Sequence, residues 1–159
     1  IKGIPPFLNY VRAISGLVMS EEANRQALRK YYEAANAGDV GAMLENLVPD
    51  YRVIDRGQQV VSSAEEYKAG FQAYASAFPG ARFEVKHLFV EGDWGAVRLH
   101  CVFPHQGQFQ GVPPTGKLIE FTSNCLYEFE NGKISVCYGG DDHISMFSQL
   151  GLIEFKQSA

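Results

Sequence analysis

The dipeptide Asn131-Gly132 constrains the fold of this chain more than any other feature of the sequence. It joins two runs of strand-forming residues between Lys117 and Asp142, and a type I′ turn needs positive φ at both central residues, which Asn and Gly tolerate best. We therefore predict one long β-hairpin. In its first arm, apolar residues alternate with polar ones, as in a strand with one buried face. The apolar positions are Ile119, Phe121, Cys125, Tyr127 and Phe129.

The two-residue turn also predicts how the two arms pair. Counting back from the turn gives the pairs Phe129–Ile134, Tyr127–Val136 and Cys125–Tyr138. Both arms would then share the buried face. After these pairs, Gly139-Gly140 favours a bulge, which turns the side chains that follow. The sequence leaves open which way Asp141 and Asp142 point.

Length, charge and cysteine content limit the classes of protein to which the chain can belong. With 159 residues and 46% hydrophobic content, the chain fits one well-buried domain. A net charge of −4, a pI near 5.5 and the lack of a Lys or Arg run argue against nucleic-acid or membrane partners and favour a small neutral or apolar ligand. The three cysteines, at positions 101, 125 and 137, form neither a disulfide framework nor a zinc motif. We therefore expect a cytoplasmic protein.

Start and stop signals predict four helices along the chain. Glu21-Glu22 favours a helix start, and the spacing of apolar residues extends this helix from about residue 21 to 37. Asp39 can cap a second, shorter helix, whose apolar stripe extends to Leu47. Ser63-Ala64-Glu65-Glu66 is a capping box that opens a third helix, whose apolar face includes Tyr67. A last short helix is expected from about residue 144 to 150.

Residues 1–20 are expected to form an extra N-terminal arm. Their apolar stretch is interrupted by Pro5-Pro6 and Arg12, so we favour an arm over the remnant of a signal peptide. No apolar run in the sequence approaches the length of a membrane span.

Strand-forming runs follow the first two helices. Residues 51–55 are typical of a short strand followed by a turn at Arg56-Gly57, which places Asp55 at a strand end. Two more strands are expected near residues 82–91 and 94–104, with a turn at Gly92-Asp93 between them. A Gly- and Pro-rich loop follows over 106–116. Helices first and long antiparallel strands afterwards indicate an α+β domain, in which helices cover one face of a curved sheet folded round a pocket.

Three stretches of the sequence resemble one known family. They are YYEAANAGDVGAMLENLVPDYRVIDRG, AEEYKAGFQAYASAFPGARFEVK and GQFQGVPPTGKLIEFTSNCLYEFENGKI. Together they are similar to the SnoaL-like polyketide cyclases, in the nuclear transport factor 2-like superfamily that also holds the ketosteroid isomerases. The resemblance covers residues 21–152, which leaves an arm over 1–20 and a tail over 153–159. It implies a cone-shaped, cystatin-like fold with an internal pocket lined by the first helix, the strand before the third helix and the long hairpin.

The resemblance also implies roles for individual residues. Tyr31 stands where ketosteroid isomerases carry a hydrogen-bond donor to an oxyanion, and Asp55 stands where they carry the general base. Arg56 replaces the proline that usually follows that base. Cys125 and Gly139 occupy positions on the hairpin where relatives carry further acid/base groups.

The residue pattern alone allows other interpretations of the same side chains. Asp55 could be a solvated turn residue, Tyr31 could be a core residue, and Cys125 could be a nucleophile or a small buried residue. Further candidates for pocket lining or acid/base chemistry are His105, Cys125, Tyr127, Tyr138, Asp141, Asp142 and His143. No set of His, Cys and carboxylate residues has the spacing of metal ligands, so we expect no metal and no cofactor.

Two functions follow as hypotheses. The first is a cofactor-independent acid/base enzyme in which Asp55 removes a proton next to a carbonyl group of a small apolar or polyketide-like compound, while Tyr31 stabilises the oxyanion. Isomerisation or aldol-type cyclisation would result. The alternative is a non-catalytic small-molecule-binding or dimerisation module of the same fold. A homodimer through the exposed face of the sheet is expected in either case, because the strands carry more apolar surface than three helices can cover.

Overall fold

The computed structural model of the chain describes residues 6–154, with side chains from residue 20 onward. The helices are α1 Pro6–Ala37, α2 Val40–Leu44, α3 Ala64–Ala77 and α4 His143–Leu150. The strands are β1 Leu47–Asp55, β2 Gln58–Val61, β3 Arg82–Glu91, β4 Trp94–Pro104, β5 Leu118–Glu130 and β6 Lys133–Gly139. In the described part of the chain, these six strands form one sheet in the order β2-β1-β6-β5-β4-β3.

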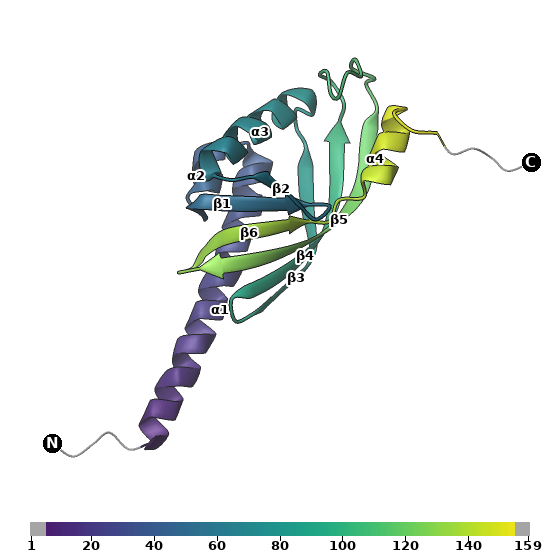
Figure 1. Cartoon of the computed structure of the whole chain (residues 1–159). Helices are drawn as coiled ribbons and strands as arrows, with labels where there is room; N and C mark the ends of the chain where they lie inside the picture. The colour runs from purple at the N-terminus through teal and green to yellow at the C-terminus, as the bar shows by residue number, and fades with distance from the viewer. Residues whose placement is uncertain (1–5, 155–159) are drawn as a thin grey trace, which may run out of the picture.

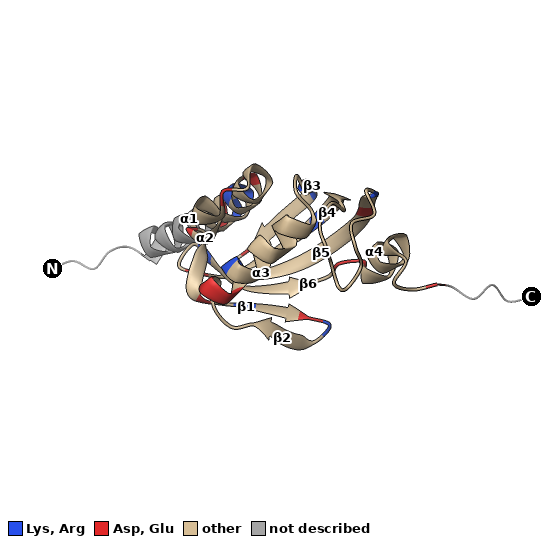
Figure 2. Cartoon of the chain, turned by 90° about the horizontal axis from the view of Figure 1, so that it is seen from above, with Lys and Arg blue, Asp and Glu red and all other residues tan. Residues whose placement is uncertain are grey.

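The sheet is strongly curved, and the helices lie on its concave side. Strands β1 and β6 run parallel, and every other neighbouring pair is antiparallel. Seen from above, α1 and α3 lie across one face of the sheet, while α4 packs against the start of β5 (Figures 1 and 2). The predicted α+β class, with helices covering one face of a curved sheet, is therefore confirmed.

The long hairpin forms as predicted, but its register changes after the first pairs. Asn131 has φ 51° and Gly132 has φ 77°, as a type I′ turn requires, and Phe129 pairs with Ile134. Beyond that pair, β6 contains one extra residue, Ser135. The pairs that follow are Glu128–Val136, Tyr127–Cys137 and Leu126–Tyr138. The predicted pairs Tyr127–Val136 and Cys125–Tyr138 are therefore wrong by one residue.

The bulge at Ser135 replaces the one predicted at Gly139-Gly140. The strand pairing does not shift at these two glycines. Before them Leu126 pairs with Tyr138, and after them, three residues further along each strand, Ser123 pairs with Asp141. A one-residue shift turns every later side chain to the opposite face of the sheet. The bulge therefore decides which side chains of β6 face the helices.

Tyr138 consequently lies on the outer face of the sheet, not on the shared inner face. Its ring stacks on Trp94 with the centroids 6.1 Å apart, and its hydroxyl donates a hydrogen bond of 2.5 Å to a carboxylate oxygen of Glu128. The inner face of this part of the hairpin instead carries Cys137 and Asp141.

Helix α1 begins earlier than the sequence pattern indicates. It starts at Pro6, whose missing N–H is no loss in the first turn of a helix, so Glu21-Glu22 lies within the helix and not at its start. Glu21 instead accepts a hydrogen bond from the Gly92 N–H at 2.8 Å, which ties the helix to the turn between β3 and β4. Residues 1–5 of the expected arm and 155–159 of the expected tail lie outside the described residues.

Strand β1 is longer than predicted, and β2 was missed. β1 begins at Leu47, which the sequence pattern assigned to the second helix. Arg56 and Gly57 both have positive φ, of 50° and 76°, so they form a tight hairpin turn that returns the chain into β2. The turn predicted at Arg56-Gly57 is thus confirmed, whereas the left-handed conformation of Arg56 was not predicted.

The helix caps follow the predicted chemistry with one difference. The Asp39 carboxylate accepts a hydrogen bond from the Ala42 N–H at 3.0 Å, and the Ser63 hydroxyl accepts one from the Glu66 N–H at 3.1 Å. Glu66 reaches back to the N–H of Ser62 at 2.7 Å, one residue before the cap, whereas a standard capping box reaches the cap residue itself. No helix within the described residues is both long and apolar enough to cross a membrane.

The alternation of faces along β5 yields a matched test of the fold. Ile119 is fully buried, whereas its neighbour Leu118 is 54% exposed. We expect Ile119→Ala to lower the free energy of unfolding by about 2–5 kcal/mol, because it removes buried methyl groups and leaves a cavity. Leu118→Ala should change it by less than about 0.5 kcal/mol. Urea unfolding of both variants measures the difference, and equal effects would contradict the assigned faces.

Candidate active site

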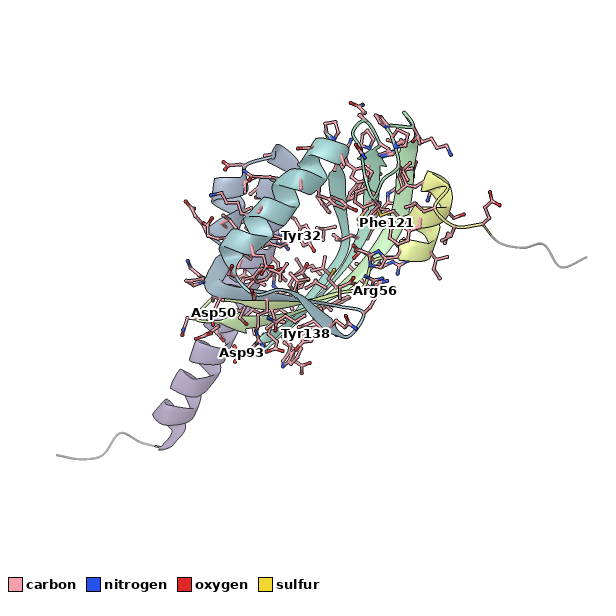
Figure 3. All side chains as sticks on the ribbon, turned by 45° about the horizontal axis from the view of Figure 1, so that its top comes forward. Tyr32, Asp50, Arg56, Asp93, Phe121 and Tyr138 are labelled. Carbon is pink, nitrogen blue, oxygen red and sulfur yellow. The ribbon has the colours of Figure 1, made fainter. Side chains whose placement is uncertain are left out.

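A cavity of about 440 Å³ lies between the concave face of the sheet and helices α1, α3 and α4. Its walls are mainly aromatic, and Tyr32 and Phe121 point into this interior (Figure 3). The aromatic lining residues are Tyr31, Tyr32, Tyr51, Tyr67, Phe71, Tyr74, Phe83, Phe103, Phe109, Phe121, Tyr127 and Phe147. A cavity of this size and character suits an apolar ligand with several rings.

One end of the cavity is polar, and its central group is Asp55. One carboxylate oxygen, Oδ1, lies 3.2 Å from Nε2 of His143, and the other accepts a hydrogen bond from Nε of Arg56 at 3.0 Å. The Asp55 side chain is only 18% exposed. His143 is the first residue of α4, and its ring stacks on Phe147 with the centroids 5.6 Å apart. The structure thus joins two predicted candidates into a carboxylate–imidazole pair.

No local pattern predicts this pairing, because Asp55 and His143 are 88 residues apart. Their contact depends on where α4 begins. Asp142 caps this helix by accepting a hydrogen bond from the Ser145 N–H at 2.9 Å, which leaves His143 in the first turn. In residues 20–154, no group of three or more His, Cys, Asp or Glu side chains is placed to hold a metal ion.

Gly139 leaves an open space beside Asp55. The two residues are direct partners across β1 and β6, and Cys125 stands on the other side of Gly139 in the register of β5 and β6. A Cβ added to Gly139 would lie 3.6 Å from Oδ1 of Asp55, in ordinary contact. Asp55, Gly139 and Cys125 thus lie beside one another in the wall of the cavity.

Four tyrosines bring phenol groups into the cavity as two hydrogen-bonded pairs. Tyr31 pairs with Tyr67 of α3, and Tyr32 pairs with Tyr127 of β5, in each case hydroxyl to hydroxyl. Burial raises the pKa of all four phenols well above the ordinary value, so they remain protonated donors at neutral pH. Tyr67, which sequence reasoning treated only as part of an apolar helix face, thus belongs to the site.

The thiols in the cavity wall differ in character. Hydrogen bonding from Cys137 lowers the pKa of Cys125 to about 7, against the opposing effect of burial, and the Ser123 hydroxyl and the Gly140 N–H add to the lowering. The Ser123 oxygen lies 3.1 Å from the Cys125 sulfur. Burial raises the pKa of Cys101, on the adjacent strand, to about 12.

Three of the predicted candidates lie away from the cavity wall. His105 is fully buried beneath the loop over residues 106–116, where its Nδ1 lies 2.9 Å from the Thr115 hydroxyl and its ring packs on Phe78. Tyr138 is on the outer face because of the bulge, and Asp142 serves as a helix cap. Asp55, Tyr31, Cys125, Tyr127, Asp141 and His143 all line the cavity.

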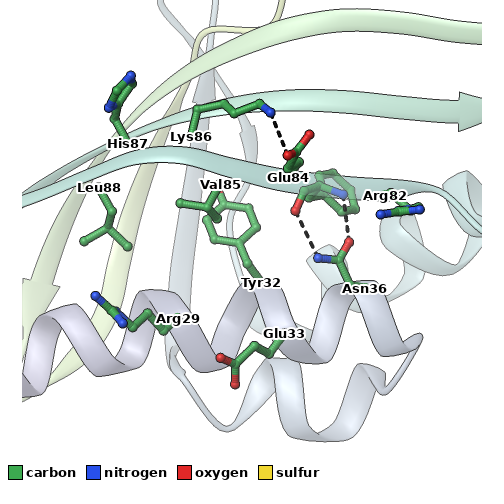
Figure 4. Close-up of a pocket in the computed structure, with 11 residues that line it drawn as sticks. Arg29, Tyr32, Glu33, Asn36, Arg82, Glu84, Val85, Lys86, His87 and Leu88 are labelled. Carbon is green, nitrogen blue, oxygen red and sulfur yellow. Dashed lines mark hydrogen bonds and ion pairs between the residues drawn. The ribbon is translucent and has the colours of Figure 1, made fainter.

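A second hollow, of about 590 Å³, lies outside the sheet between α1 and the free edge of β3 (Figure 4). There, the amide of Asn36 donates to the Phe83 carbonyl at 3.0 Å and accepts from the Phe83 N–H at 2.7 Å. Lys86 pairs with Glu84 at 2.6 Å. Charged side chains dominate this groove, and it lacks the convergence of acid, base and phenol groups that marks the inner cavity.

The curved sheet, the helices inside it and the aromatic cavity together define the cone-shaped fold of the nuclear transport factor 2-like class. Within that class, the chain belongs to the SnoaL-like polyketide cyclase family, whose family model matches residues 25–150. The resemblance noted from the sequence is thereby confirmed. A comparison with curated proteins gave no match.

This chain matches several solved structures of the same fold over nearly the whole length of each. AclR of Streptomyces galilaeus, a proposed hydroxylase, is 23% identical with a TM-score of 0.77, over 84% of this chain and 99% of AclR. IdmH of Streptomyces antibioticus, a proposed polyketide cyclase, is 26% identical with a TM-score of 0.71, over 80% and 98%. A proposed SnoaL-like polyketide cyclase of Jannaschia sp. CCS1 is 22% identical with a TM-score of 0.76, over 84% and 95%. Structural similarity at such low sequence identity supports the shared fold and carries no information on the reaction.

The buried phenol pair Tyr31–Tyr67 should be energetically coupled. We expect Tyr31→Phe and Tyr67→Phe each to cost about 1–3 kcal/mol of unfolding free energy, because each leaves a buried hydroxyl without its partner. The double variant should cost less than the sum of the two, since it removes both hydroxyls. Urea unfolding of the wild type, the two single variants and the double variant gives the coupling. Strictly additive losses would contradict the pairing.

Proposed function

We propose that the protein is a cofactor-independent acid/base enzyme that moves a proton next to a carbonyl group of an apolar, polyketide-like compound. Isomerisation or aldol-type ring closure would be the outcome. The observation that carries this proposal is the Asp55 carboxylate at the polar end of an aromatic cavity, 3.2 Å from His143. Membership of the SnoaL-like polyketide cyclase family supports the same class of chemistry.

Asp55 is the proposed base. Its position at the end of β1 places the carboxylate where the rings of a bound ligand would end, next to the space left by Gly139. His143 orients the carboxylate by holding Oδ1, and as an imidazole it can relay the abstracted proton. Arg56, which is largely exposed, holds the other oxygen. Because both carboxylate oxygens are held in place, less conformational entropy of the base is lost when the transition state forms.

The buried phenols are the proposed stabilisers of charge. Removing a proton next to a ketone produces an enolate oxygen, and a preorganised donor that meets this oxygen stabilises charge that appears only during the reaction. Tyr31 and Tyr67 stay protonated because burial raises the pKa of both phenols. One such donor contributes about 3 kcal/mol to the stability of the transition state. When one phenol of the Tyr31–Tyr67 pair donates to the enolate oxygen, the hydrogen bond from the second phenol polarises the first and strengthens its donation.

The size and lining of the cavity suggest the kind of substrate. A volume of about 440 Å³ with aromatic walls fits a flat carbonyl compound of several rings. The carbonyl oxygen would meet the phenols, and the acidic C–H would meet Asp55. A cytoplasmic location, which we also propose, agrees with the three free thiols at Cys101, Cys125 and Cys137.

The alternative is a binding module without catalysis. It is favoured by Cys125 and Gly139, which stand where the resemblance places acid/base groups. Such a module would keep the cavity and bind an apolar ring compound without moving its protons. Proton exchange on a bound ketone therefore separates the two functions.

We expect the protein to accelerate exchange of the C1 protons of 2-tetralone with deuterium in D₂O, followed by NMR. Asp55→Asn should lower this rate by about 10²–10⁴-fold, the usual contribution of a positioned base. The control, Asp50→Asn, changes an exposed carboxylate on the same strand outside the cavity and should leave the rate unchanged. Unaltered exchange in Asp55→Asn would remove Asp55 from the base role.

Binding of 2-naphthol, a phenol shaped like the enol of 2-tetralone, provides the second readout. Fluorescence titration should give similar affinity for the wild type and Asp55→Asn, because the variant keeps the cavity and the phenols. Binding without any proton exchange by the wild type would support the alternative, the binding module.

We propose in addition a homodimer formed through the outer face of the sheet. The register of the strands aligns four side chains on the outer face, one from each of β3, β4, β5 and β6. Trp94, which is 51% exposed, extends this apolar patch. The four are Phe89, Ala96, Leu126 and Tyr138. A contiguous exposed apolar patch of this kind is typical of an interface between proteins.

Replacing Leu126 by Asp should dissociate this dimer, because the charge would be buried at the centre of the interface. Leu118→Asp is the matched control, since Leu118 is exposed to a similar degree, 54% against 51%, on the same face and strand. Sedimentation velocity at micromolar concentration should give a dimer for the wild type and the control and a monomer for Leu126→Asp. A monomeric wild type would overturn the proposal.

A further inference from the structure

The loop over residues 106–116 brings one aromatic ring into the wall of the cavity, and the proposed acid/base reaction does not use it. This ring belongs to Phe109, which lines the cavity and packs edge to face on Tyr74 of α3, with the ring centroids 5.3 Å apart. Phe109 also packs on Phe78, at 4.9 Å, and Phe78 is fully buried in the core. The loop is thereby joined to the cavity through a single side chain that rests on the core.

The register of the sheet divides the cavity at the level of the proposed base. The inner face of β5 carries Tyr127, Cys125 and Phe121 in this order along the strand, and all three line the cavity. Asp55 is level with Cys125, through its partner Gly139 in β6. From Asp55 the wall therefore continues in two directions, toward the paired phenols on one side and toward phenylalanine rings on the other.

The second direction ends at Phe109. Phe121 packs edge to face on Phe103 of β4, with the centroids 5.0 Å apart. Phe103 in turn packs on Tyr74 at 5.6 Å, and Tyr74 packs on Phe109. The Tyr74 hydroxyl is engaged with the sulfur of Met146 at 3.4 Å. The rings of Phe121, Phe103, Tyr74 and Phe109 thus form an apolar arm of the cavity, with Phe109 as its last member.

We infer that Phe109 is a specificity-determining residue, which limits the length of the ring compounds that the cavity accepts. The inference deepens the proposed function and rests on it for the orientation of the ligand, whose carbonyl oxygen meets the phenols while its other rings lie in the apolar arm. In this orientation the far edge of the ligand meets the ring of Phe109. The ligand class is therefore a fused-ring carbonyl compound whose length is set by the distance between the phenols and Phe109.

The base of the loop is anchored tightly to the end of α3. The N–H groups of Gln106 and Gly107 both donate to the carbonyl oxygen of Ala77, at 3.0 and 2.9 Å. A Cβ at Gly107 would lie 2.3 Å from the carbonyl oxygen of Ser76, a distance that no side chain tolerates. Only glycine therefore allows this contact between loop and helix, and the anchored loop holds Phe109 as a fixed wall.

The tip of the loop fixes the direction of the Phe109 side chain. Phe109 and Val112 exchange two backbone hydrogen bonds, of 3.0 and 2.8 Å, and Gln110 and Gly111 between them have φ of 50° and 80°. Positive φ at both central residues is the geometry of a type I′ turn. Because the turn is held by backbone bonds, shortening the side chain of Phe109 should leave the turn in place and open space at the end of the apolar arm.

Fluorescence titration of the full chain with 2-naphthol and the longer 2-anthracenol tests the inference. Phe109→Ala should raise the affinity for 2-anthracenol relative to 2-naphthol by about tenfold or more, because the added ring enters the space that the phenyl group leaves. Phe109→Leu should shift this ratio less in the same direction, and Phe109→Trp should shift it the opposite way. The matched control is Gln108→Ala, at an exposed position of the same loop that does not line the cavity, and it should keep the wild-type ratio.

An unchanged ratio in Phe109→Ala, or an equal shift in Gln108→Ala, would overturn the inference. An equal loss of affinity for both phenols would do the same, since it would show that the loop collapses when the ring is removed. If Phe109→Ala does not fold, Phe109→Leu and Phe109→Trp decide by the opposite directions of their shifts.

The measurement is separate from that of proton transfer. Asp55→Asn should keep the wild-type ratio of affinities, so the loss of the proposed base would leave the role of Phe109 intact. Conversely, a wild type that exchanges the protons of 2-tetralone while Phe109→Ala keeps an unchanged ratio would retain the acid/base function and remove Phe109 from the control of ligand length.

Discussion

The bulge at Ser135 is the local feature on which the chemistry of this domain depends. An extra residue in β6 shifts the pairing of the hairpin by one and so reverses the faces of all residues that follow. Without it, Tyr138 would point among the helices, and Cys137 and Asp141 would point to the outside. With it, a thiol, a glycine and a carboxylate line the cavity along the last part of β6, and an aromatic ring is left for the outer surface.

The cavity has two chemically different parts, a polar end with an ionisable pair and an interior lined by buried phenols. Asp55 stands at the end of β1 and His143 at the start of α4, so the ionisable pair lies near the opening. The phenol pairs come from the last turns of α1, the first turn of α3 and the last part of β5, where Tyr31, Tyr32 and Tyr127 are almost fully buried. In such a dry interior each hydrogen bond is stronger than in water, and an unpaired polar group is costly, which explains why the four hydroxyls occur as two pairs.

Much of the fold could be predicted from the sequence, because its signals are local. Asn131-Gly132 fixed the long hairpin, Gly92-Asp93 separated β3 from β4, and Asp39 and Ser63 marked helix starts. The bulge at Ser135 and the left-handed Arg56 were missed, since tertiary packing selects both. The contact between Asp55 and His143 was missed because it joins residues 88 apart, which no short-range pattern encodes. The family resemblance supplied Asp55 and Tyr31, but it could not supply Tyr67, which sequence reasoning assigned to packing.

The amide of Asn36 protects the sheet from other chains. Strand β3 is an edge, and the free N–H and C=O groups of an edge strand can pair with a strand of another molecule and start aggregation. Asn36 takes up both backbone groups of Phe83, as a neighbouring strand would, and the irregular pairing at Lys86 breaks the ladder a little further on. At the opposite edge, β2 spans only four residues and offers little length for pairing. A single side chain on α1 thus contributes to keeping an open, strongly apolar sheet from growing by addition of further strands.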